Sequence, residues 1–94
     1  MKLLIIIPTY NEIENIESFI QAVFLVVPPF AGILVVDDGS PDGTADAATK
    51  LMNSLPDSSR LALLRRSGKQ GLASAYLAGF AWGLERGFDV FLEM

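Results

Sequence analysis

Short apolar runs alternate with stretches of helical periodicity along this chain. Consecutive apolar residues bounded by turn residues are typical of parallel strands that are buried on both faces. Four segments fit this description: residues 2–7, 32–37, 60–65 and 88–94. Between them, apolar residues recur every three or four positions, as on one face of an amphipathic helix. The alternation predicts an α/β fold, a three-layer Rossmann-like parallel sheet with right-handed crossovers.

Three helices are predicted between these strands. The first follows Asn11, which can cap it in a variant of the capping box, and ends at Pro28. The second takes Ser40 as its N-cap, with Pro41 at the first helical position. The third covers residues 72–86 and places small residues four apart on one stripe, so its backbone can lie close against the sheet. These small residues are Ala75, Gly79 and Gly83.

The composition narrows the classes of function. The chain has 94 residues, 51% of them hydrophobic, which is enough for one compact domain with a core. Its formal charge of −4 provides no basic surface for a phosphate backbone, so nucleic acid is not an expected partner. It contains no Cys and no His, which excludes disulfides, thiol nucleophiles, imidazole bases and the usual zinc sites. Its chemistry must therefore use carboxylates, hydroxyls, Lys, Arg and backbone groups.

The apolar segments predict neither a signal peptide nor a membrane span. The N-terminal run stops at Pro8 without a small-residue cleavage site behind it. The most apolar region, residues 22–36, is shorter than the ~20 residues that a membrane helix needs. It is also interrupted by Pro28, Pro29 and Gly32. A cytoplasmic location is therefore expected.

Two adjacent carboxylates, Asp37 and Asp38, stand at the end of the second predicted strand. Ligands of open parallel sheets bind beyond the carboxyl ends of the strands, near the point where strand order reverses. The polar segment 8–12 follows the first strand, so both clusters are expected to face one crevice. Helix capping explains Ser40 and Asp42 well, but it explains Asp38 poorly.

Two like charges at the mouth of a buried strand repel each other and lose hydration, so at least one needs a specific hydrogen-bond donor. The ring N–H groups of guanine or uracil are such donors, and Tyr10 can stack on the same base. Joint metal ligation by Asp37 and Asp38 is awkward, because adjacent strand residues point to opposite faces. The pattern favours one carboxylate for a ligand and one for structure, and it leaves guanine and uracil undistinguished.

Four motifs in order resemble the N-terminal half of the inverting family 2 glycosyltransferases, which have the GT-A fold. They are PTYNE, VVDDGSPDGT, GLASAYLAGF and WGLERGFDVFLEM. The likeness is greatest to the branch that acts on polyprenyl phosphate or dolichyl phosphate with mannose. It covers essentially the whole chain, so residues 1–94 are expected to form a single nucleotide-sugar-binding domain.

The resemblance implies a set of residues for the nucleotide part of a GDP-mannose site. They are Pro8, Tyr10, Glu12, Val36, Asp38 and Lys69. Asp38 would lie at the base or ribose and Lys69 near the diphosphate, although a solvated loop lysine is an equally good interpretation. Arg65 and Arg66 flank the third strand, and such arginines are expected to be solvated or paired at the surface. No catalytic or metal-binding residue is assigned within the chain.

The resemblance also implies a metal and an acceptor for the complete protein. In the family, an Asp-x-Asp motif after the fourth strand holds Mg²⁺ or Mn²⁺, which stabilises the departing nucleoside diphosphate while the acceptor phosphate attacks. That motif would begin beyond Met94. The chain is therefore expected to be the nucleotide-binding half, inactive alone and able to self-associate through exposed strand edges. The complete protein would act on a polyprenyl phosphate, peripherally at the cytoplasmic membrane face.

Two alternatives remain open. One is a glycosyltransferase of the same family that uses a UDP-sugar, because the carboxylate–base argument fits uracil as well as guanine. The other is a non-catalytic nucleotide-binding module. A dinucleotide site is not expected, since no G-x-G-x-x-G follows the first strand.

Overall fold

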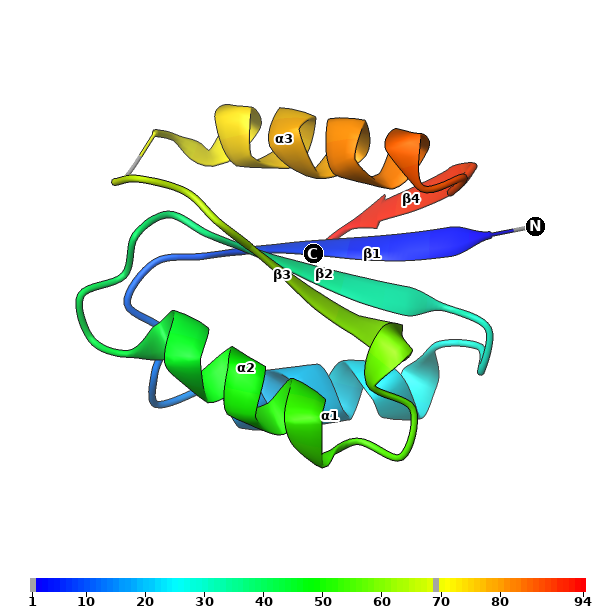
Figure 1. Cartoon of the computed structure of the whole chain (residues 1–94), viewed down its shortest axis with the longest axis horizontal. Helices are drawn as coiled ribbons and strands as arrows, with labels where there is room; N and C mark the ends of the chain where they lie inside the picture. The colour runs from blue at the N-terminus through cyan, green and yellow to red at the C-terminus, as the bar shows by residue number, and fades with distance from the viewer. Residues whose placement is uncertain (1, 69) are drawn as a thin grey trace.

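The computed structural model describes residues 2–68 and 70–94, and a sheet of four parallel strands forms its centre (Figure 1). The strands, in the spatial order β3-β2-β1-β4, are β1 (Leu3–Thr9), β2 (Gly32–Asp37), β3 (Leu61–Arg65) and β4 (Val90–Glu93). One face is covered by α1 (Ile16–Val26) and α2 (Thr44–Ser54), and the other by α3 (Leu72–Glu85). A short 3-10 helix, η1 (Ser58–Arg60), leads into β3. The predicted three-layer α/β fold is confirmed.

Strand β1 lies between β2 and β4 in the sheet, and both of its faces are apolar. Ile5 and Ile7 pack in the cluster beneath α1 and α2, and Leu4 and Ile6 pack in the cluster beneath α3. Each of these four side chains is at most 3% exposed. Burial of this kind contributes about 25 cal/mol per Å² of apolar surface, so the continuous apolar run stabilises the sheet from both sides.

Two helices begin later than the local sequence predicts. Helix α1 starts at Ile16, and Asn11 does not cap it but takes the left-handed conformation, with φ of 56°. Helix α2 starts at Thr44, and the hydroxyl of Ser40 donates to Asp37 instead of capping that helix. Both predicted N-caps are therefore wrong. The backbone N–H of Asn11 donates to Ser40 in the other loop, and the Ser40 hydroxyl bonds to Asp37 rather than to the first turn of α2.

The small-residue stripe of α3 faces the sheet as predicted, with Ala75, Gly79 and Gly83 all buried. A Cβ atom on Gly83 would lie 2.6 Å from Cε1 of Phe91 and 2.9 Å from Cδ2 of Leu4. Both distances are shorter than a normal carbon–carbon contact of about 3.5–4.0 Å. The absence of a side chain at this position thus sets how closely α3 approaches β1 and β4.

Gly83→Ala is therefore expected to lower the free energy of unfolding by about 1–2 kcal/mol, because the added methyl group overpacks this contact. The loss should appear even though alanine favours a helix by about 1 kcal/mol over glycine. Urea denaturation followed by circular dichroism measures it. Ala81→Ser, on the exposed side of the same helix, should change stability by less than about 0.5 kcal/mol. A Gly83→Ala variant as stable as the wild type would show that the contact relaxes freely.

Several large apolar side chains remain on the outer surfaces of the helices. Leu25 and Val26 of α1 and Leu77 and Leu84 of α3 are each more than 60% exposed. Within the described part of the chain, no helix combines the length and apolar character that crossing a membrane requires. Strands β3 and β4 form the two edges of the sheet. Self-association through these edges remains a prediction.

Candidate functional site

The loops that follow β1 and β2 are tied together at the carboxyl edge of the sheet. Consecutive backbone N–H groups of the first loop donate to side chains of the second loop and of the first residue of α2: Asn11 to Oγ of Ser40 (2.9 Å), Glu12 to Oγ1 of Thr44 (2.9 Å) and Ile13 to Oδ2 of Asp42 (3.1 Å). Those of Asn11 and Ile13 lie at the exposed surface, where they replace hydrogen bonds to water. They also fix the two predicted ligand-binding loops relative to each other.

Asp42 accepts hydrogen bonds at the start of α2 as well as across the loops. Its donors are the backbone N–H and hydroxyl of Thr44 and the backbone N–H of Ile13. Desolvation acts to raise the pKa of Asp42, but these hydrogen bonds together hold it below its ordinary value. The ionised carboxylate therefore stabilises the fold above its unfolded-state pKa, and this contribution is lost as pH falls through the lowered folded-state pKa.

Asp37 is a structural carboxylate, and the residue is only 1% exposed. Its Oδ1 accepts from the hydroxyls of Thr9 and Ser40, both at 2.7 Å, and its Oδ2 accepts from the backbone N–H of Ser40 at 2.9 Å. Hydrogen bonds to an ionised group are stronger than neutral ones. Asp37 thus joins the end of β1 to the loop after β2.

Asp38 belongs to a separate network that reaches α3. Its Oδ1 accepts from Nε of Arg66 at 2.7 Å, and the two side chains are only 8% and 10% exposed. Its Oδ2 accepts from the backbone N–H of Gln70 at 3.3 Å, and Nη1 of Arg66 donates to Oγ of Ser74 at 2.8 Å. The two adjacent carboxylates, at the last residue of β2 and the residue after it, therefore have different partners.

The two arginines after β3 differ from each other. Arg65 is 56% exposed and pairs with Asp46 at the surface, as predicted. The prediction of a surface position is wrong for Arg66, which is buried against Asp38. The signal was present in the sequence, because two predicted parallel strands that end side by side place the carboxylate pair next to the arginine pair. The structure shows this register directly, with Asp37 opposite Arg65.

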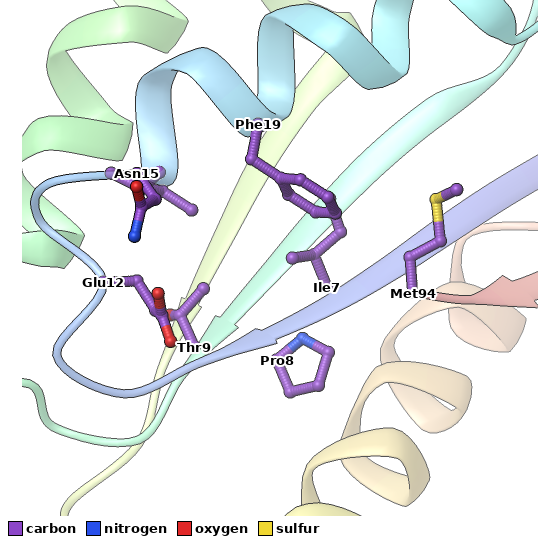
Figure 2. A pocket seen from close by; sticks show the side chains of 8 residues that line it. Ile7, Pro8, Thr9, Glu12, Asn15, Phe19 and Met94 are labelled. Atoms are coloured by element: carbon purple, nitrogen blue, oxygen red, sulfur yellow. The ribbon is translucent and has the colours of Figure 1, made fainter.

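Two cavities open at the end of β1. One, of about 120 Å³, is lined by Pro8, Thr9, Tyr10, Asp38, Gly71, Leu72 and Ala75. The other, of about 240 Å³, is lined by Ile7, Pro8, Thr9, Glu12, Asn15, Ile16, Phe19 and Met94. Figure 2 shows the ring of Phe19 from α1 directed toward Ile7 of β1 in the larger cavity. We call them the Asp38 cavity and the Glu12 cavity.

The structure brings together three of the predicted nucleotide-site residues, since Pro8, Tyr10 and Asp38 all line the Asp38 cavity. Glu12 lines the Glu12 cavity, and Pro8 is shared by both. Val36 is 0% exposed in the cluster beneath α3, so its side chain lines neither cavity. Lys69 lies outside the described residues.

The sequence resemblance implies a divalent metal in the complete protein. Mg²⁺ and Mn²⁺ prefer several oxygen ligands, commonly carboxylates. Within residues 2–68 and 70–94, no three Asp, Glu, His or Cys side chains come together in a way that could hold a metal ion. Asp37 and Asp38, although adjacent, each serve a different network. The described residues therefore do not make up a metal site by themselves.

Proteins of known activity resemble the chain over nearly its whole length. A polyprenol monophosphomannose synthase from Mycolicibacterium smegmatis is 52% identical over 91 residues, which are 97% of this chain and 33% of that protein. An undecaprenyl-phosphate mannosyltransferase from Micrococcus luteus is 49% identical over 94 residues, 100% of this chain and 37% of that protein. A dolichol-phosphate mannosyltransferase from Pyrococcus furiosus is 39% identical and is covered to 25% of its length. The chain thus spans between 25% and 37% of the length of these relatives.

The fold and the family agree with these similarities. A mannosyltransferase from Pyrobaculum calidifontis, solved in complex with GDP-Man and Mn²⁺, matches with a TM-score of 0.78 and 28% identity, over 86% of this chain and 24% of that one. The sequence profile of glycosyl transferase family 2 matches residues 4–85. Since this match covers most of the chain, the protein belongs to glycosyl transferase family 2.

Proposed function

We propose that this chain binds the nucleotide part of GDP-mannose, within an enzyme that transfers mannose to a polyprenyl phosphate with inversion. The observation that carries the proposal is the buried carboxylate of Asp38 beside Pro8 and Tyr10, at the carboxyl edge of the sheet. The 52% identity to a polyprenol monophosphomannose synthase supports the choice of donor and acceptor. In this proposal residues 1–94 form one nucleotide-binding domain of a protein that acts peripherally at the cytoplasmic face of the membrane.

The residues at this edge suit a nucleotide in three ways. The carboxylate of Asp38 can accept from a ring N–H of the base, and Tyr10 offers an aromatic ring in the same cavity. The bonds between the loops after β1 and β2 hold these groups in place before the ligand binds, which lowers the entropy cost of binding. We assign Lys69 to the diphosphate, as the sequence resemblance implies. A bound divalent cation would neutralise the diphosphate as it departs.

Tyr10 provides a test of base stacking. If its ring stacks on the base, Tyr10→Phe should keep most of the affinity for GDP, because the ring is unchanged. Tyr10→Ala should lose roughly 1 kcal/mol of binding free energy, or about fivefold in affinity. Isothermal titration calorimetry of the full-length protein measures both values. If Phe is as poor a replacement as Ala, the hydroxyl group is the important part and stacking is wrong.

The proposed activity is tested by assaying the full-length protein and a chain of residues 1–94 side by side. Each is given polyprenyl phosphate, Mg²⁺ or Mn²⁺, and either GDP-mannose or UDP-glucose. We expect mannose transfer by the full-length protein with GDP-mannose only, and no transfer by residues 1–94, whose binding of GDP should be weak. Transfer of glucose from UDP-glucose would favour a UDP-sugar enzyme. Tight GDP binding without transfer by either form would favour a non-catalytic module.

A further inference from the structure

A further cavity lies at the amino edge of the sheet, where the strands begin. Its volume is about 550 Å³, more than twice that of the Glu12 cavity. It is lined by Gly32 and Leu61, the first residues of β2 and β3, and by Lys2, which precedes β1. Because a strand rises about 3.3 Å per residue, the two ends of β2 are about 17 Å apart. We call this space the amino-edge cavity, which is separate from the Asp38 and Glu12 cavities.

Positive side chains are concentrated around the amino-edge cavity. Three of the chain's seven Lys and Arg residues line it: Lys2, Arg60 and Arg86. Asp57 is the one acidic residue among the described residues that line it, and its carboxylate accepts from the backbone N–H and the hydroxyl of Ser59. Three positive groups and one negative group give this lining a formal charge of +2, in a chain whose formal charge is −4.

Carbonyl oxygens and aromatic rings hold these positive groups in place. Nζ of Lys2 donates to the carbonyl oxygen of Arg86 at 2.8 Å and lies 4.5 Å from the centre of the Phe88 ring. The guanidinium of Arg86 lies 4.1 Å from the centre of the Trp82 ring. That of Arg60 donates to carbonyl oxygens of the loop before β2. In the described part of the chain, neither Lys2 nor Arg60 forms an ion pair with a carboxylate.

Arg86 has a carboxylate nearby, but the two groups interact weakly. Its Nη1 lies 3.7 Å from Oε2 of Glu85, and the two side chains are 47% and 77% exposed. Ion pairs between exposed side chains contribute little, because water screens both charges. An anion can therefore bind the guanidinium of Arg86 without first breaking a strong ion pair. Arginine binds phosphate oxygens well, since its planar group donates two parallel hydrogen bonds.

Aromatic side chains form the apolar part of the same cavity. Trp82 and Phe88 line it as a stacked pair, with ring centres 6.2 Å apart and planes inclined by 27°. Phe30, which also lines the cavity, is 57% exposed. Small-molecule sites typically combine apolar and aromatic walls with a few polar groups in a volume of about 300–1,000 Å³. This lining suits a molecule with a flat ring and a negative group.

We propose that the amino-edge cavity binds a small organic phosphate, whose phosphate group pairs with Lys2 and Arg86 and whose ring packs on the aromatic side chains. A phosphate monoester carries about −1.5 to −2 charge at pH 7, which complements the +2 charge of the lining. A carboxylate would balance only half of that charge. The inference does not rest on the proposed function, and a ligand at this edge leaves the nucleotide site free.

The experiment is isothermal titration calorimetry of the full-length protein with 1-naphthyl phosphate at pH 7.5, with and without saturating GDP. Inorganic phosphate lacks the ring and 1-naphthol lacks the charge. We expect 1-naphthyl phosphate to bind at least about tenfold more tightly than either, because only it uses both parts of the cavity. GDP should leave this affinity unchanged, since the amino-edge cavity lies at the other edge of the sheet.

A pair of double variants tests the site itself. Lys2→Gln with Arg86→Gln should weaken 1-naphthyl phosphate by at least about tenfold. Lys50→Gln with Arg65→Gln removes the same total charge at positions outside the cavity, and it should change the affinity less than about twofold. Phe30→Ala should weaken 1-naphthyl phosphate but leave inorganic phosphate unchanged. Because Phe30 is exposed, this variant is expected to fold even if the first double variant does not.

The contrary results are distinct. Equal losses in the two double variants would show general attraction by surface charge, and loss of binding in saturating GDP would place the probe in the nucleotide site. Either result overturns the proposal, as does the absence of binding by 1-naphthyl phosphate. Equal affinities for 1-naphthyl phosphate and inorganic phosphate would show that the aromatic side chains do not contact the ligand, which also contradicts it. Failure of GDP to bind affects only the proposed function, because the double variants still test this site.

Discussion

Asp38→Asn is expected to weaken GDP binding by about 10- to 100-fold, and Asp37→Asn much less. A charge-assisted hydrogen bond contributes about 1.5–3 kcal/mol, and the amide removes both the charge and one acceptor atom. Asp38 lines the cavity at the end of β1, whereas Asp37 is 1% exposed with its oxygens bound to Thr9 and Ser40. The measurement is isothermal titration calorimetry of the full-length protein with GDP.

The pair of variants separates recognition from folding. Both replace a buried carboxylate by an amide of the same shape at adjacent positions, so loss of stability alone would affect both. Unfolding curves for each variant show whether the protein is folded at the titration temperature. Equal losses of GDP affinity for Asp37→Asn and Asp38→Asn in folded protein would contradict the assignment of Asp38 to the ligand.

The sheet was predictable because its strands are encoded by local apolar runs. Ile5 and Ile6 are buried on opposite faces of the sheet, so apolar and polar residues need not alternate along the strand. A short continuous apolar run therefore predicts a strand without knowledge of the neighbouring strands. The small-residue stripe of α3 was predictable for a similar reason, since positions four apart share one face of a helix. A proline predicts the end of a strand, but β1 continues through Pro8 to Thr9.

The helix starts were mispredicted because they depend on contacts between distant residues. Asn11 and Ser40 are good N-cap residues by local criteria. In the structure the backbone of Asn11 donates to Ser40, and the hydroxyl of Ser40 donates to Asp37. Residues 29 positions apart meet only after the strands have paired. Capping preferences are defined for a single helix, so they do not include competing hydrogen bonds to residues of another loop.

The acidic part of the candidate site was proposed from the sequence, but Arg66 was not identified as part of it. Charge repulsion and lost hydration predicted a specific donor for at least one of Asp37 and Asp38, and a ligand was the expected donor. The structure supplies a donor from the protein itself, in Arg66, and the pair is nine-tenths buried. A charged residue after a short strand is usually at the surface, so only the parallel register of β2 and β3 distinguishes Arg66 from Arg65.

Asp37→Ala is expected to lower the free energy of unfolding by about 3 kcal/mol. The substitution removes three hydrogen bonds to a buried carboxylate and leaves the hydroxyl of Thr9 and the N–H and hydroxyl of Ser40 without this acceptor. Removing the carboxylate also removes the cost of burying it, so the expected loss is smaller than the sum of the three hydrogen bonds. Urea denaturation at neutral pH measures the change.

The matched control for this variant is Asp46→Ala, which also removes a carboxylate, but one that lies at the surface. Asp46 is 81% exposed and pairs with Arg65 in solvent, so its loss should change stability by no more than about 0.5 kcal/mol. If Asp37→Ala does not fold, Asp37→Asn can be measured instead. It keeps one acceptor oxygen, so its loss in free energy of unfolding should lie between those expected for Asp37→Ala and Asp46→Ala. Similar stabilities for Asp37→Ala and Asp46→Ala would mean that the network does not hold β1 to the loop after β2. The ordered edge of the sheet would then need another cause, such as the bonds from the backbone of residues 11–13.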